Sequence, residues 1–312
     1  MSGATVPAGH AQVNVSEGLD IPSATGRHCH GGFFFVSTIH CPQRPGQGCC
    51  CRFTVEKHCG CGRYHRISLE SMLAELQPGV PVCIGAHGSF VEEREVRSET
   101  RARYHRISSG GGNRPFHYIA FHWPSDLAVP FCPDIKTRRL GKRAGFNGIY
   151  LAHLTRMIPA ANPISFAGHS HGTRVISSAL HLLAGGSVQG YRVSDNCPSR
   201  RMRAVFGASA IDSHWLSPGE KYGLALNRVE CLLNLRTRRD IALTAYPLQD
   251  PLLHQALGKT GFQPRQLSRM GVNRQKLREF DVTKYVGCRH EVAHYFPHDA
   301  IWLTMAPYLY FD

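Results

Sequence analysis

Long apolar stretches are missing from this sequence of 312 residues. No run approaches the roughly 18 consecutive apolar residues of a transmembrane helix, so we expect no membrane span. The first 25 residues lack the apolar core of a secretory signal, and we therefore expect a cytoplasmic protein. With 42% hydrophobic and 19% charged residues, the composition is that of a globular protein and excludes collagen-like, coiled-coil and mostly disordered chains.

Acidic residues are scarce: 22 Asp and Glu face 36 Lys and Arg, for a formal net charge of +14. Such a surplus can attract nucleic acid or other anionic partners. The basic residues are scattered, however, and no recognisable nucleic-acid-binding module accompanies them. We therefore expect no nucleic-acid partner, and a non-catalytic basic binding protein remains an alternative. The sequence leaves the oligomeric state open.

Cysteine is the exception to this ordinary composition, because seven of the 12 cysteines lie between Cys29 and Cys61. Without an export signal we expect reduced thiols. Residues 49–51, His58, Cys59, Cys61 and His65 offer zinc ligands, but the cluster lacks paired C-x-x-C spacing. The sequence therefore favours a Cys-rich loop at 41–62 with no metal.

The rest of the chain alternates between short apolar runs and helical patterns. Residues 1–27 are polar and predict a flexible tail, and residues 28–312 form one domain. Strands are expected at 31–39, near 52–56, and at 80–86, 116–121, 163–167, 202–208, 229–235 and 280–286. Helices are expected at 69–76, 92–106, 135–158, 173–184 and from about 299 to 306. This alternation predicts an α/β fold with a mainly parallel central sheet and helices on both faces.

The expected strand at 163–167 leads through a G-x-S-x-G motif at residues 168–172 directly into a helix. This is the context of a nucleophile elbow, a turn so tight that side chains at Gly168 and Gly172 would obstruct it. The turn would raise the Ser170 hydroxyl above the sheet. It would also leave the N–H of His171 at a helix N-terminus, where negative charge is stabilised.

A second strand end supports the same chemistry. Residues 80–86 lead into His87-Gly88-Ser89, upstream of the elbow. A second oxyanion-hole N–H comes from such a position, so we expect the N–H groups of Ser89 and His171 to form the oxyanion hole.

With these motifs the chain resembles the α/β-hydrolase superfamily, and more narrowly the uncharacterised bacterial serine-hydrolase-like proteins of the DUF900 type. The resemblance covers roughly residues 80–312 and excludes the Cys-rich segment. The matching residues are His87-Gly88, Trp123-Pro124-Ser125, residues 168–172, Arg174-Val175 and Ala179-Leu180. The resemblance implies an α/β-hydrolase fold but no particular substrate.

A hydrolase of this kind needs an acid and then a histidine after the serine. Asp240 follows the expected strand 229–235, and Asp212 follows the preceding one; we favour Asp240. His290, His294 and His298 follow the last expected strand, which ends at Gly287. Loop length favours His290 as the base, with His294 as the alternative.

A competing motif overlaps the base, because residues 290–294 read H-E-x-x-H. In zinc hydrolases, histidines at i and i+4 share a helix face and the glutamate activates water. The expected strand and Gly287 before the motif argue against such a helix, and a third ligand would have to be His298 or Asp299. The favoured function is therefore a serine hydrolase that cleaves a small-molecule acyl substrate, such as a carboxylic ester, without a cofactor. Residues 250–279 are a candidate cap over its site.

Overall fold

The computed structural model describes residues 32–45, 51–60, 62–112, 114–126, 133–193, 198–249 and 254–312. The expected tail at 1–27 lies outside these residues, as do 46–50 and 61 of the Cys-rich loop and 250–253 of the candidate cap. None of the helices within the described ranges combines the length and apolar character needed to cross a bilayer.

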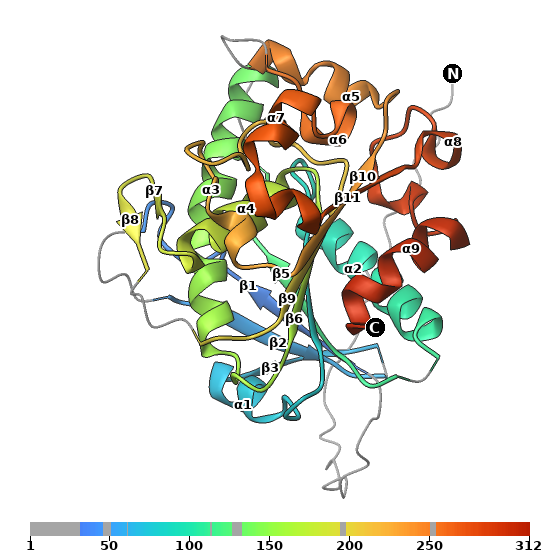
Figure 1. The fold of residues 1–312 in the computed structure, drawn as a ribbon. Helices are drawn as coiled ribbons and strands as arrows, with labels where there is room; N and C mark the ends of the chain where they lie inside the picture. The colour runs from blue at the N-terminus through green and yellow to red at the C-terminus, as the bar shows by residue number, and fades with distance from the viewer. Residues whose placement is uncertain are drawn as a thin grey trace, which may run out of the picture.

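A nine-stranded sheet runs through the molecule in the order β11-β10-β9-β6-β4-β5-β1-β2-β3 (Figure 1). Its strands are β1 (Phe33–Ser37), β2 (Thr54–His58), β3 (Tyr64–Ile67), β4 (Val82–Ala86), β5 (His117–His122), β6 (Ile164–His169), β9 (Met202–Gly207), β10 (Cys231–Arg236) and β11 (Leu277–Asp281). Every neighbouring pair from β11 across to β1 is parallel, and β2 is antiparallel to both β1 and β3. A separate two-stranded ribbon consists of β7 (Ser187–Val188) and β8 (Tyr191–Arg192).

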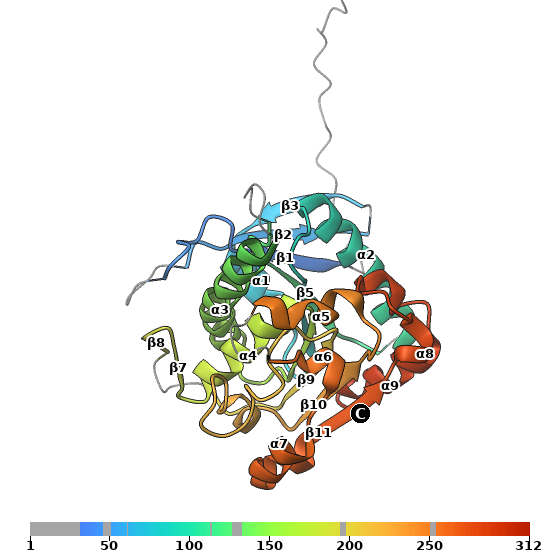
Figure 2. The same cartoon turned by 90° about the horizontal axis from the view of Figure 1, so that it is seen from above.

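Helices cover both faces of this sheet (Figure 2). On one face lie α3 (Pro133–Met157) and α4 (His171–Leu183), and on the other α2 (Glu93–Gly110) and α9 (Asp299–Tyr310). The remaining helices are α1 (Leu69–Ala74), α5 (Ile241–Thr244), α6 (Leu257–Thr260), α7 (Pro264–Arg269) and α8 (Thr283–Val286). The prediction of a mainly parallel α/β sheet covered on both sides is confirmed, and the arrangement is consistent with the α/β-hydrolase fold.

Each face of the sheet builds its own hydrophobic core. In β1, Phe34 and Val36 join the core under α3 and α4, whereas Phe33 and Phe35 join the core under α2 and α9. Successive side chains of a strand point to opposite faces, so a strand covered on both sides is apolar throughout. This is why β1 and β4 appear in the sequence as continuous, almost wholly apolar runs.

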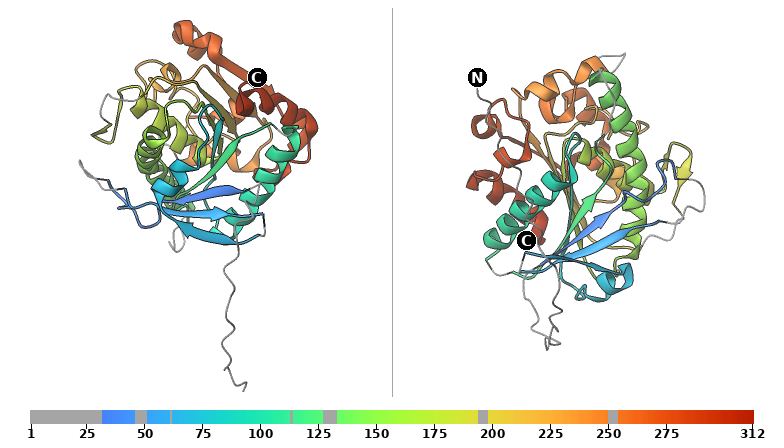
Figure 3. Two further views of the ribbon diagram at one scale, coloured as in Figure 1. Left: turned by 90° about the horizontal axis from the view of Figure 1, so that it is seen from below. Right: turned by 180° about the vertical axis from the view of Figure 1, so that it is seen from behind.

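One strand prediction needs correction. The expected strand 280–286 is instead β11 (Leu277–Asp281) followed by α8, which starts at Thr283. The carboxylate of Asp281 accepts the backbone N–H of Thr283 at 3.0 Å and so favours the turn into the helix. The short strand expected near 52–56 is β2, and it pairs with β3, which the sequence did not predict. The β2–β3 hairpin extends the sheet beyond β1 (Figure 3).

The cysteines differ from the expectation at one position. Cys59 is disulfide-bonded, whereas Cys83, Cys231 and Cys288 are free thiols. The expectation of reduced thiols is therefore wrong at Cys59, and a sulfur in a disulfide cannot serve as a thiolate ligand. Within the described part of the Cys-rich stretch, no three potential ligand groups converge.

Candidate active site

The turn between β6 and α4 holds Ser170 in a strained backbone conformation. Its φ is 51° and its ψ is −125°, a region that residues with a Cβ rarely adopt. Three backbone hydrogen bonds hold it there: Ser170 N–H donates to Gly207 O at 3.0 Å, and Ser170 O accepts the N–H groups of Thr173 at 3.1 Å and Ala210 at 3.3 Å. The serine is thereby fixed at the carboxyl edge of the sheet, at the first turn of α4.

The two glycines of the motif are required by close packing. A Cβ at Gly168 would lie 2.8 Å from Cδ1 of Ile176. A Cβ at Gly172 would overlap the carbonyl oxygens of Ala86 and His87 at the end of β4. Helix α4 therefore passes so close to β4 and β6 that these two positions cannot carry side chains, as the spacing of the motif predicts.

Ser170, His290 and Asp240 form a continuous chain of hydrogen bonds. Nε2 of His290 lies 3.0 Å from Oγ of Ser170, and Nδ1 lies 2.8 Å from Oδ2 of Asp240. Asp240 is completely buried at the N-cap of α5, where its Oδ1 accepts the N–H of Leu243 at 2.9 Å. A carboxylate can only accept, so it selects the tautomer with hydrogen on Nδ1 and leaves Nε2 to accept the serine proton.

His169 holds the backbone of the base. Its Nε2–H donates to the carbonyl of His290 at 2.7 Å. Burial lowers the pKa of His169 well below its usual range, with smaller contributions from His290 and Arg103, so the ring is neutral. The motif did not single out His169, because this residue occupies one of its variable positions.

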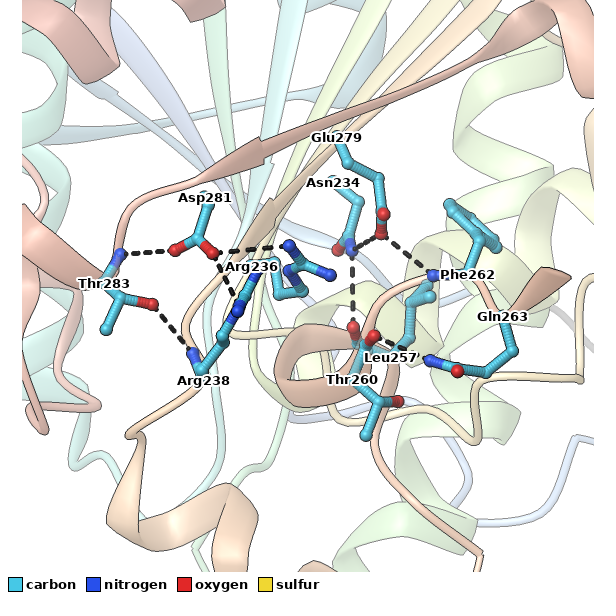
Figure 4. A network of polar contacts seen from close by, with 10 residues as sticks. All are labelled: Asn234, Arg236, Arg238, Leu257, Thr260, Phe262, Gln263, Glu279, Asp281 and Thr283. Carbon is cyan, nitrogen blue, oxygen red and sulfur yellow. Dashed lines mark hydrogen bonds and ion pairs between the residues drawn. The ribbon is translucent and has the colours of Figure 1, made fainter.

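A polar network ties together the chain segments that lead to the acid and to the base (Figure 4). Asp281, at the end of β11, accepts from Arg236 at 3.3 Å and from Arg238 at 2.8 Å. The N–H of Arg238 donates to Oγ1 of Thr283 at 3.0 Å, at the start of α8. The segment from β10 to Asp240 is thus fastened to the segment from β11 into α8.

Part of the candidate cap is built into the sheet edge, also visible in Figure 4. Oε1 of Glu279 accepts from the N–H of Phe262 at 2.9 Å and from Asn234 Nδ2 at 3.1 Å. The same Asn234 amide donates to the carbonyl of Leu257 at 3.3 Å. Leu257 is fully buried, and residues 277–279 belong to β11. These portions of 250–279 therefore belong to the domain's packed body.

The segment after β4 lies against the serine. A Cβ at Gly88 would come within 3.1 Å of the Cβ of Ser170. Ser89 Oγ lies 2.6 Å from Nδ1 of His171. His171 is the first residue of α4, where a backbone N–H has no intrahelical partner. The two residues expected to supply oxyanion donors therefore flank Ser170.

His87 and Trp123 fix the course of this segment. The indole N–H of Trp123 donates to the carbonyl of His87 at 2.9 Å, and its backbone N–H donates to Nε2 of His87 at 3.2 Å. Burial lowers the pKa of His87 well below its usual range, which keeps Nε2 available as an acceptor. Both residues are among those on which the sequence resemblance rests, and these hydrogen bonds hold them side by side.

The alternatives considered from the sequence occupy other surroundings. The Oδ1 of Asp212 accepts the hydroxyl of Tyr246 at 2.6 Å, and its Oδ2 lies 3.5 Å from Nδ1 of His254. The ring of His294 is 41% exposed and lies 3.4 Å from Oε2 of Glu291. The hydrogen-bond chain from Ser170 runs instead through His290 to Asp240.

The H-E-x-x-H stretch does not form the helix that a zinc hydrolase needs. Residues Val292–His294 are a short 3-10 helix, and His290 lies before it. The two histidines therefore do not share an α-helical face. Both ring nitrogens of His290 are also engaged, by Asp240 and Ser170.

Another set of side chains has the composition of a metal site. One ligand atom each from Asp212, His214 and His254 lie within 4.8 Å of one another. They line a cavity of about 740 Å³ beside α4, together with Arg174 and Tyr246. Neither a cavity nor a metal site was predicted here from the sequence, because the lining side chains come from distant segments.

Comparisons with known proteins give little beyond this geometry. No protein-family model and no curated protein matches the chain. Among solved structures, it is similar to a thermophilic esterase from the Planctomycetes species Thermogutta terrifontis, at 12% sequence identity. The match covers 74% of this chain and 82% of the esterase, with a TM-score of 0.35.

Proposed function

We propose that this protein is a serine hydrolase of the α/β-hydrolase superfamily that cleaves a carboxylic ester or a related acyl substrate. The observation that carries the proposal is the chain from Ser170 Oγ to His290 at 3.0 Å and from His290 to Asp240 at 2.8 Å. A hydroxyl, an imidazole and a buried carboxylate in these contacts are the elements of an activated nucleophile. The order serine, aspartate, histidine along the chain is that of the superfamily.

In the proposed reaction, Ser170 attacks the acyl carbon while Nε2 of His290 takes its proton. The buried Asp240 orients the imidazole and stabilises its protonated form. His290 then gives the proton to the leaving group, and an acyl-enzyme remains. Water activated by His290 hydrolyses this ester and restores Ser170.

Negative charge on the tetrahedral oxygen would be stabilised by the backbone N–H groups of Ser89 and His171. The contact between the Ser89 hydroxyl and the His171 ring at 2.6 Å supports this assignment, because it joins the two donor segments. The helix N-terminus at His171 adds a favourable dipole. Donors that are already oriented cost no reorganisation during the reaction.

Every step of this route uses side chains and backbone of the chain itself, so the proposal needs no cofactor. Kinship with the DUF900-type bacterial proteins, a single domain over residues 28–312, and a cytoplasmic location belong to the same proposal.

Replacement of Ser170 tests this function. Ser170→Ala should lower kcat for a p-nitrophenyl ester by roughly 10⁶-fold, because the nucleophile is lost. The matched control is Ser109→Ala, at an exposed position on α2, which should keep full activity. Activity of Ser170→Ala within tenfold of the parent, in a folded protein, would exclude the proposed nucleophile.

A further inference from the structure

The cavity beside α4 is rich in cationic side chains. Among the described residues that line it, four are basic and one, Asp212, is acidic. The basic residues are Arg138, Lys142, Arg174 and Lys221. Two histidines, His214 and His254, add to the donors. A concave site lined by one sign of charge concentrates ligands of the opposite sign.

Arg174 is the most informative of these residues, because it is buried without a carboxylate partner. Its exposed fraction is 9%, and its Nε is buried with no hydrogen-bond partner among the described residues. Within the described ranges, no carboxylate lies within ion-pair distance of its guanidinium. One amino group donates to the Tyr246 hydroxyl at 3.1 Å, and Cζ lies 4.6 Å from the centre of the Trp215 ring. Burying an unpaired cation is costly, and a bound anion would remove that cost.

The acid of the cavity is separated from Arg174 by a tyrosine. The Tyr246 hydroxyl donates to Asp212 at 2.6 Å and accepts from Arg174, so it stands between the two charges. Burial raises the pKa of Tyr246, which therefore remains a protonated donor. A second cation faces the same platform, because Lys221 Nζ lies 3.8 Å from the centre of the Trp215 ring. An anion near the indole would be shared by Arg174 and Lys221.

The described lining of this cationic cavity includes a residue of α4, the helix that starts directly after the proposed nucleophile. Arg174 lies one helical turn after Ser170, and side chains on a helix lean towards its N-terminus. A Cβ at Gly141 of α3 would collide with Nη1 of Arg174 and come within 3.4 Å of Nε2 of His171. That Nε2 is buried and has no hydrogen-bond partner among the described residues. The Arg174 guanidinium and the ring of His171, the residue after Ser170, therefore both lie close to Gly141.

We infer that this cavity binds an anionic group of the substrate, a carboxylate or a phosphate, through Arg174 and Lys221. The proposed hydrolase would then prefer acyl substrates that carry such a group over neutral ones of the same size. This inference rests on the proposed function and narrows its substrate class.

A metal cation is the competing occupant, because Asp212, His214 and His254 have suitable ligand atoms. The charge of the surroundings disfavours it, since basic residues outnumber the acid four to one along the described lining. The carboxylate is also engaged by Tyr246 at 2.6 Å. The anion is therefore the occupant that the observations favour, and the cation is an outcome of the test.

The test compares two esters of one chain length, mono-p-nitrophenyl glutarate, which is anionic, and its neutral methyl ester. Spontaneous hydrolysis is subtracted with Ser170→Ala. The parent should favour the anionic ester in kcat/KM. Loss of a charge-assisted hydrogen bond in Arg174→Gln should lower the ratio of anionic to neutral kcat/KM by about 10- to 100-fold. The exposed Lys221→Gln should lower it less, and Arg139→Gln, an exposed α3 residue that does not line the cavity, should leave it unchanged.

A second readout, the thermal shift with inorganic phosphate, needs no turnover. Phosphate should raise the Tm of the parent but not of Arg174→Gln. If Arg174→Gln fails to fold, the exposed rim variant Lys221→Gln, alone and combined with Arg138→Gln, replaces it in both measurements.

The outcomes separate the two proposals. An unchanged ester ratio in both Arg174→Gln and Lys221→Gln, with hydrolysis still dependent on Ser170, overturns the anion site and leaves the hydrolase. If no ester is hydrolysed, the hydrolase fails; Arg174-dependent stabilisation by phosphate then still supports the anion site, and its absence overturns it. Stabilisation by Zn²⁺ that His254→Asn abolishes, without any effect of phosphate, overturns the anion in favour of a cation.

Discussion

Two carboxylates, Asp240 and Asp212, follow neighbouring parallel strands of the sheet, and each lies beside a histidine. The surroundings of these two carboxylate–histidine pairs differ. After β10, Asp240 contacts His290 at 2.8 Å, and His290 contacts Ser170 at 3.0 Å. After β9, Asp212 lies 3.5 Å from His254 and accepts the Tyr246 hydroxyl. The first pair leads to a serine at a strained turn, and the second opens into a cationic cavity.

The difference shows that the chemical role of a carboxylate–histidine pair depends on the third group that the pair contacts. In the first pair the carboxylate is fully buried and fixes one tautomer, so the far nitrogen faces a hydroxyl. In the second, Tyr246 donates to the carboxylate and also accepts from Arg174. We therefore expect the first pair to move protons and the second to bind charge.

The largest effect should come from removing the histidine of each pair. His290→Ala should lower kcat/KM for neutral esters about as much as Ser170→Ala, roughly 10⁶-fold, because nucleophile and base act as one unit. His254→Ala and the half-exposed His294→Ala should cost less than about tenfold, because His254 lies beside Asp212 and His294 beside Glu291, whereas His290 contacts Ser170. The comparison fails if His294→Ala inactivates and His290→Ala does not.

The acids should differ by a smaller factor. Asp240→Asn should lower kcat by about 10⁴-fold, since an amide favours the wrong tautomer of the base. Asp212→Asn keeps the size of the side chain and should change the hydrolysis of neutral esters by less than about tenfold. Steady-state kinetics on one neutral ester measures both variants. Equal losses would show that the two carboxylates cannot be assigned separate roles.

The smallest effect concerns the pH dependence of stability. The sheet that carries the first pair also buries His122, at the end of β5, whereas the second pair lines a cavity. Burial lowers the pKa of His122 to about 4, so the unfolded chain takes up a proton below about pH 6.5 while the folded chain does not. The free energy of unfolding should therefore fall as the pH drops from about 6.5 to about 4. His122 should account for about 1.4 kcal/mol per pH unit of this slope.

Urea unfolding across this pH range measures the effect. His122→Gln should flatten the slope by about one proton, whereas His105→Gln, at an exposed position on α2, should not. An equal slope in the His122 variant and the parent would show that this imidazole is charged in the folded protein.

The elbow could be predicted from the sequence because its requirements are local and steric. Gly168 and Gly172 are forced by atoms within a few residues or on the adjacent strand. The parallel sheet could be predicted for a similar reason, since strands buried on both faces must be apolar along their length.

The remaining features depend on contacts between distant segments. Asp212 and Asp240 both follow parallel strands, and the choice between them depends on which histidine reaches which carboxylate. The error at 280–286 arose because the buried Val282 and Val286 are the N-cap and the last residue of a short helix, and a brief apolar run does not distinguish helix from strand. The cavity beside α4 could not be predicted from the sequence, because its lining comes from several separate segments.

The most direct measurement of the central claim is covalent labelling with a fluorophosphonate, followed by mapping of the modified peptide. Our account predicts one adduct per chain, on Ser170, that is absent in Ser170→Ala and strongly slowed in His290→Ala. An adduct on another residue, or no adduct on a folded protein that hydrolyses esters, would contradict it.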